Sequence, residues 1–149
     1  MTWEDDELNE YEKRRARLAQ ENTLSSQRLH LLETRNTHEW LALRTLIQKT
    51  CEGINAKAGR EILTSKDPVT NHLLIHREDG EKLKAEYTPQ TKIVEFSCDA
   101  PPFVKRDYEM LVRTVKGNEI VGWWNGRDFE NAEDVAKSVV SAFLHAGMV

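Results

Sequence analysis

The first 52 residues of this 149-residue chain contain neither glycine nor proline. These two residues most often end a helix, and the helix-favouring residues Glu, Arg, Leu, Ala and Gln dominate the stretch instead. Thr2 is placed to cap a helix whose first turns carry the acidic residues Glu4 to Glu7, which favour the positive end of a helix dipole. The first third of the chain is therefore predicted to be helical.

The outer part of this helical segment carries a narrow apolar seam. Five large residues recur about every 3.5 positions, as in a coiled coil: Leu8, Tyr11, Leu18, Leu29 and Leu32. Polar residues interrupt the seam at Arg15, Asn22 and Ser25. Because so thin a stripe cannot hold a helix on its own, residues 1–35 are predicted to form a coiled-coil-like arm that needs a partner surface. That partner could be a second copy of the chain.

A second helix start is indicated at Asn36, which could cap the following turn while Glu39 returns to its backbone N–H. We expect a break or kink there, which would separate the arm from an α+β domain at residues 36–149. The segment after it has a wider apolar stripe, of the kind found on a helix packed against a core: Trp40, Leu43, Ile47, Cys51, Ile54 and Ala58. Gly59 is predicted to end this helix.

After Gly59 the apolar period changes from 3.6 to 2, which indicates strands, with a turn at Asp67-Pro68. A three-residue loop at Glu78-Asp79-Gly80 would place Arg77 opposite Glu81 and Ile75 opposite Leu83. A two-residue turn would instead oppose like charges, which is unfavourable. The first hairpin is therefore predicted in the three-residue register.

A last hairpin is predicted to turn at Gly117-Asn118, with Lys116 opposite Glu119 and Val112 opposite Trp123. Asn131 is placed to cap a final helix. The whole pattern predicts an α+β fold with a long N-terminal helical segment, an antiparallel sheet of about five to six strands and a C-terminal helix.

Composition limits the possible partners. The formal net charge is -4 and the isoelectric point about 5.8, so no excess of positive charge exists to bind nucleic acid. No apolar run approaches the roughly 20 residues of a membrane-spanning helix, and the acidic start does not resemble a secretory signal. The two cysteines, Cys51 and Cys98, lack the spacing of a disulfide framework. We therefore expect a cytoplasmic protein without a membrane span.

The common phosphate-binding, dinucleotide-binding, acyl-transfer and zinc-hydrolase motifs are missing, so enzyme activity has no positive support. His72 and His76 lie four apart in a predicted strand, roughly 13 Å from one another, which is too far for one metal ion. The basic cluster Lys13 to Arg17 has acidic partners at helical spacing, as on a solvated helix face. We expect no metal and no cofactor, and a site built from His72, Glu86 and Tyr87 would lack a defining spacing.

The segment around Trp123 and Trp124 is the main candidate for a binding site. Neighbouring residues in a strand point to opposite faces, and both faces of the predicted hairpin are apolar. Such a hairpin is expected to be covered on both sides, either by the helix at residues 37–58, a second copy, a ligand or another protein. The candidate binding residues are Trp123, Trp124, Arg127, Tyr108 and Met110.

These observations favour a non-enzymatic protein-interaction module that self-associates through its N-terminal helices, with a homodimer as the expected form. The alternative is a domain that binds a small molecule or lipid at an apolar site on the sheet near Trp123 and Trp124.

Overall fold

The structure of this protein is a computed structural model that describes residues 2–66 and 70–148. The turn predicted at Asp67-Pro68 lies outside the described residues. The chain divides into two compact units, Met1–Thr34 and Arg35–Val149, and each is described by itself below. Neither of the helices in the described part of the chain has the length and apolar character needed to cross a bilayer.

Helix α1 spans Trp3–Ala58. The Thr2 hydroxyl caps its start by accepting a hydrogen bond from the Asp5 backbone N–H at 3.3 Å. The helix ends before Gly59, whose φ of 72° is a left-handed conformation that glycine adopts without steric cost. Both ends of the predicted helical region are therefore where the capping residues indicate.

The break expected at Asn36 is wrong, because α1 continues through this residue. The Asn36 side chain is buried, and its Oδ1 accepts a hydrogen bond from the Tyr87 hydroxyl at 3.3 Å. The polar group that resembles a helix cap in the sequence thus pairs with a strand residue 51 positions away. A change of helix direction near Asn36 stays a prediction.

The sheet has seven antiparallel strands in chain order, so every strand pairs with its neighbours in sequence. The strands are β1 Leu63–Ser65, β2 His72–Arg77, β3 Lys82–Thr88, β4 Ile93–Ser97, β5 Arg106–Val115, β6 Asn118–Trp124 and β7 Phe129–Glu130. Helix α2, Ala132–His145, follows. The α+β class is confirmed, and the strand count is slightly higher than predicted because the two-residue edge strand β7 adds to it.

The first predicted hairpin is confirmed in its register. Leu73 pairs with Ala85 and Ile75 with Leu83, and the Arg77 N–H donates to the Glu81 carbonyl at 2.8 Å. Gly80 has a φ of 98°, the left-handed position of a three-residue loop. Charge matching across the strands was therefore a sufficient signal here.

The last hairpin has a different register from the predicted one. Val115 pairs with Asn118 and Met110 with Trp123, which is a shift of two residues. The turn is centred on Lys116 and Gly117, with φ of 52° and 81°. In this register the Thr114 hydroxyl donates to the Glu119 carboxylate at 2.6 Å. Because the shift is even, each side chain keeps the face predicted for it.

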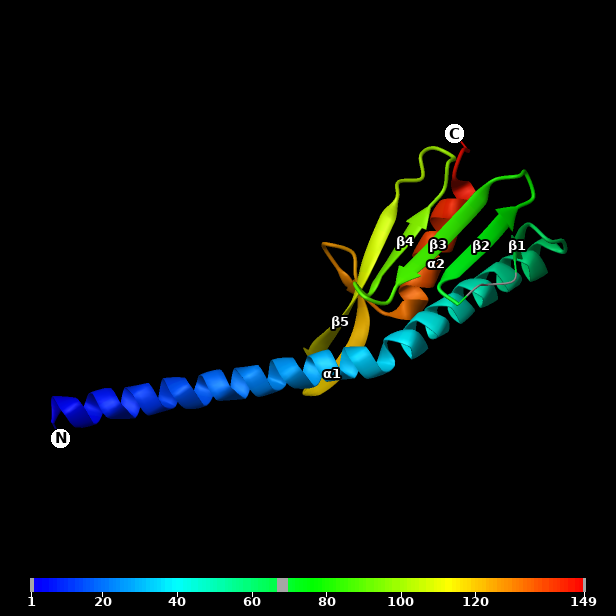
Figure 1. Ribbon diagram of the computed structural model, residues 1–149. Coiled ribbons are helices and arrows are strands. Elements are labelled where there is room, and N and C mark those ends of the chain that lie inside the picture. The colour runs from blue at the N-terminus through cyan, green and yellow to red at the C-terminus, as the bar shows by residue number, and fades with distance from the viewer. Residues whose placement is uncertain (1, 67–69, 149) are drawn as a thin grey trace. The chain divides into compact units, whose positions relative to one another are not determined.

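One face of the sheet is covered by helices, and Figure 1 shows α2 lying against it. The Trp40 ring of α1 stacks on Tyr87 of β3 with centroids 5.4 Å apart, and Trp123 of β6 meets the same Tyr87 edge-on at 6.2 Å. The helix residues buried at this face are Trp40, Leu43, Ile47, Cys51, Val135, Ala136, Val139, Val140 and Phe143. This helix-covered face holds the core of the second unit.

Arg77 is a buried cation at the end of β2, with its side chain 3% exposed. Its guanidinium forms a two-point ion pair with the Asp79 carboxylate, both distances being 2.7 Å. Its Nη1 also donates to the carbonyl oxygens of Phe143 at 2.7 Å and Ala146 at 2.6 Å. A cation at the end of a helix satisfies carbonyls that have no partner within the helix. Arg77 therefore joins the sheet to the C-terminal end of α2.

Replacing Arg77 with methionine should destabilise the protein by about 3 kcal/mol, because the α2 carbonyls lose a buried charged donor. Urea unfolding at neutral pH measures this loss. The matched control is Arg60→Met, which removes the exposed Arg60–Glu78 ion pair and should cost far less. Equal losses in the two variants would contradict the role given to Arg77.

The Arg77 guanidinium, as a hydrogen-bond donor, lowers the pKa of the Asp79 carboxyl. A carboxyl with a lowered folded-state pKa stabilises the fold above its unfolded-state pKa of about 3.9, and this contribution disappears as the pH falls through the folded-state pKa. Asp79→Asn should therefore be less stable than the wild type at pH 7, and the difference should shrink progressively below pH about 4. Paired urea titrations across this range test the trend, and a difference independent of pH would contradict it.

Candidate functional site

The structure places three of the five candidate binding residues in the core. Tyr108, Met110 and Trp123 are 2%, 1% and 1% exposed, and all point to the helix-covered face. The Tyr108 ring meets Phe96 edge-on at 5.9 Å, while Trp123 meets Tyr87. The space beside these rings is filled by the protein's own side chains, so an apolar ligand there would have to separate them.

Trp124 and Arg127 lie elsewhere. Trp124 is half-buried and points to the opposite face of the sheet, which we call the open face. Arg127 is exposed in the loop between β6 and β7. The Asn125 side chain organises this loop by accepting hydrogen bonds from the N–H groups of Arg127 at 2.9 Å and Asp128 at 2.8 Å. The structure therefore does not bring the five candidate residues together.

Both α2 and the part of α1 in the second unit pack on the helix-covered face, so within the described residues of this unit no helix lies over the open face of the last hairpin. Phe129 of β7 lies here over Gly122 of β6: a Cβ added at Gly122 would be 2.5 Å from the Phe129 Cζ atom. The Arg113 guanidinium lies 5.4 Å from the centroid of the same ring. Ile120 and Val115, farther along the hairpin, are 40% and 39% exposed. A cover was expected on both faces of this hairpin. On the open face, the cover that the second unit provides is the Phe129 ring.

Substituting Gly122 with alanine should cost about 2 kcal/mol, because the Phe129 ring must move off the strand. Gly53→Ala is the matched control: nothing lies within 4 Å of its added Cβ, and its position inside α1 should make alanine stabilising by about 0.5–1 kcal/mol. Thermal and urea unfolding measure both variants. A neutral Gly122→Ala would show that Phe129 is not held against the strand.

The rest of the open face is polar. Cross-strand pairing sets His72, Glu86, Glu95 and Asp107 in one row, and His76 lies opposite Lys82 in another. Partial burial, together with the charges of Lys66 and Lys82, lowers the pKa of His76. A neutral His76 fits this surrounding because a protonated ring would add to the local positive charge. In the described residues no group of three or more His, Cys, Asp or Glu side chains is arranged to hold a metal ion.

Neither cysteine belongs to a catalytic arrangement that the structure shows. Cys51 is buried in α1, and desolvation raises the pKa of its thiol to about 11, so it stays protonated at neutral pH. Cys98 is half-buried just after β4.

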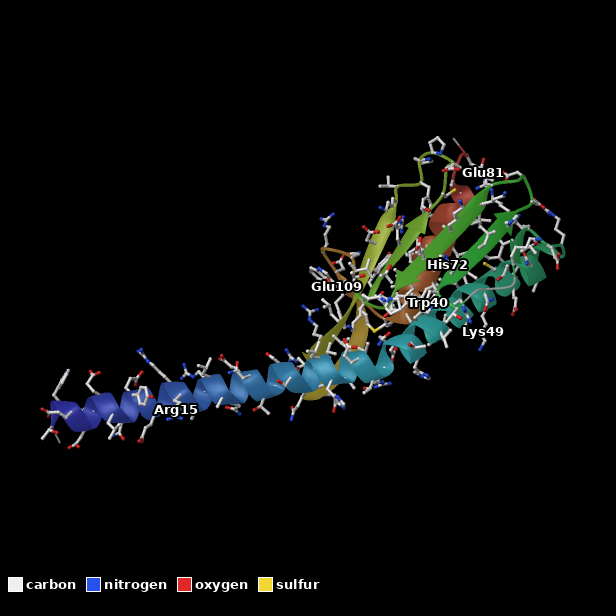
Figure 2. The ribbon with its side chains drawn as sticks, in the orientation of Figure 1. Arg15, Trp40, Lys49, His72, Glu81 and Glu109 are labelled. Carbon is white, nitrogen blue, oxygen red and sulfur yellow. The ribbon has the colours of Figure 1, made fainter. Side chains whose placement is uncertain are left out.

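Two hollows meet at the end of the sheet near the C-terminus of α2. The smaller, of about 430 Å³, is lined by Leu74, Gly80, Glu81, Lys82, Lys84, Ser97, Cys98 and Asp99. The larger, of about 640 Å³, is lined by Glu81, Asp99, Ala100, Pro101, Pro102, Gly147 and Met148. Glu81 and Asp99 border both hollows, and Figure 2 labels Glu81 at this end of the sheet. Sequence reasoning did not single out these residues, because three separate turns bring them together.

No protein-family model matches the chain, and neither a curated protein nor a solved structure matches it significantly.

Proposed function

We propose that this protein is a non-enzymatic interaction module that self-associates through its N-terminal arm, residues 1–35. The observation that carries the proposal is the exposure of large apolar side chains along this helix. Those more than half exposed are Trp3 at 72%, Leu8 at 55%, Tyr11 at 59%, Leu18 at 58% and Leu29 at 59%. An exposed apolar row of this kind is unfavourable in water and favours a protein partner.

The partner that fits the arm is a second copy of the same chain. Leu8, Tyr11, Leu18 and Leu29 occupy the two core positions of a heptad repeat, so two such helices can pair seam to seam. Asn22 lies on the same seam, and an asparagine at such a position restricts the register and number of helices at some cost in stability. Because this pattern belongs to the arm's own sequence, two copies can pair without any other protein.

The estimated free energy of association indicates a reversible assembly. Fully burying a leucine-sized side chain contributes about 1.5–3 kcal/mol, and these four residues are only half exposed, so each contributes roughly 1 kcal/mol. Eight such side chains in a dimer give roughly 8 kcal/mol before the cost of association, which is several kcal/mol. Self-association should therefore depend on protein concentration.

Both cysteines are free, which supports a reducing compartment, and we propose the cytoplasm as the location. The alternative of an apolar ligand beside Trp123 has less support, since Tyr108, Met110 and Trp123 already fill that space with one another and with neighbouring rings.

The double variant Leu8→Ser and Leu18→Ser in the full chain should shift the protein to a monomer at concentrations where the wild type is a dimer. Sedimentation equilibrium over a range of concentrations measures the mass. Leu24→Ser is the matched control, because Leu24 is exposed on the same helix but lies off the seam, so this variant should assemble as the wild type does.

Removing residues 1–35 should have the same effect as the double variant. A wild-type protein that is monomeric at every concentration would refute the proposal, as would an assembly whose mass is unchanged in the double variant and on removal of the arm.

A further inference from the structure

The larger hollow beside the C-terminal end of α2 has the composition of a small-molecule site. Its volume of about 640 Å³ lies within the usual range for such sites, and most of its lining is apolar, from Ala100, Pro101, Pro102 and Met148. Gly147 contributes backbone without a side chain, and its φ of 80° favours glycine at this position. The lining therefore leaves room for an apolar body of modest size.

Among the described residues, the polar side chains that line the hollow are two carboxylates, Glu81 and Asp99. Neither has a side-chain hydrogen bond or ion pair among the described residues, whereas the nearby Asp79 is paired with Arg77 and Glu78 with Arg60. Glu81 is half-buried and Asp99 is exposed. Two of these four acidic side chains therefore form ion pairs within the fold, and the two that border the hollow form none among the described residues.

The cations near the larger hollow have other hydrogen-bond partners or lie outside its lining, although the Arg77 guanidinium, 3.7 Å from a Cβ built at Gly147, also attracts Glu81. Arg77 is committed to Asp79 and to the carbonyls of α2. Lys82 and Lys84 line the smaller hollow and are not part of the lining of the larger one. A positive group held between Glu81 and Asp99 on the side of the larger hollow would complement their charge.

We infer that this hollow binds a small organic molecule that joins an apolar body to a protonated amine, with the amine at Glu81 and Asp99 and the apolar body against Pro101, Pro102 and Met148. This site belongs to the second unit and does not depend on self-association through the arm. It also differs from an apolar site beside Trp123, since its lining comes from the turns at the end of the sheet.

The test uses the full-length protein and two probes that differ only in charge, 2-phenylethylamine and 2-phenylethanol. Titrations are followed by the backbone amide signals of the ¹⁵N-labelled protein at pH 7. The amine should shift the signals of Asp99, Ala100, Gly147 and Met148, and should bind about five- to tenfold more tightly than the alcohol. Raising the salt concentration should reduce this preference.

The variant Glu81→Gln with Asp99→Asn should lose the preference for the amine and bind the two probes alike. Glu109→Gln is the matched control, since Figure 2 shows Glu109 well away from Glu81 on the same domain. Equal affinity of the wild-type protein for amine and alcohol would overturn the inference, and this result needs no variant to fold. Amine-induced shifts that avoid Asp99, Ala100, Gly147 and Met148, or an equal effect of Glu109→Gln, would also overturn it.

Discussion

A single buried guanidinium holds the sheet, a turn and a helix in one arrangement. Arg77 extends from β2, pairs with Asp79 in the following loop and donates to the last carbonyls of α2. Burying a charge is costly unless it is fully paired, so these three parts must come together with little freedom. This arrangement also fixes the position of two residues that line the larger hollow at this end of the sheet. Glu81 follows the same loop, and Gly147 follows the same helix.

A cluster of aromatic rings around Tyr87 is the second set of contacts that joins distant elements of the domain. Tyr87 is sandwiched between a stacked Trp40 and an edge-on Trp123, so one ring links α1, β3 and β6. Neighbouring tryptophans in β6 point to opposite faces of the sheet, so Trp123 is part of the core, while Trp124 lies half-buried on the open face opposite Phe129. A pair of adjacent tryptophans therefore does not make a binding site by itself.

Sequence signals between residues close together in the chain predicted the parts of the fold that depend on such neighbours. The α+β class, the ends of α1, the cap of α2 by Asn131 and the first hairpin follow from helix caps, period and charge matching. The two errors have different causes, one a contact with a distant residue and the other an uncommon backbone conformation within a turn. Asn36 resembles a cap but pairs with Tyr87, and Lys116 takes a left-handed conformation that lysine seldom adopts, which moves the last turn by one residue. The hollow at Glu81 and Asp99 joins three turns, so no sequence period could reveal it.

The order of the strands also implies how the domain assembles. Each strand pairs with the one made just before it, so the sheet can grow from contacts between close neighbours as the chain leaves the ribosome. The contacts that close the core are of another kind: the hydrogen bond from Tyr87 to Asn36 spans 51 residues, and that from Arg77 to Phe143 spans 66. Since α2 follows all of the described strands in the chain, the part of the sheet that it covers is made before its cover. The inner half of α1 precedes every described strand, so it is available to shield part of this apolar face before α2 is made.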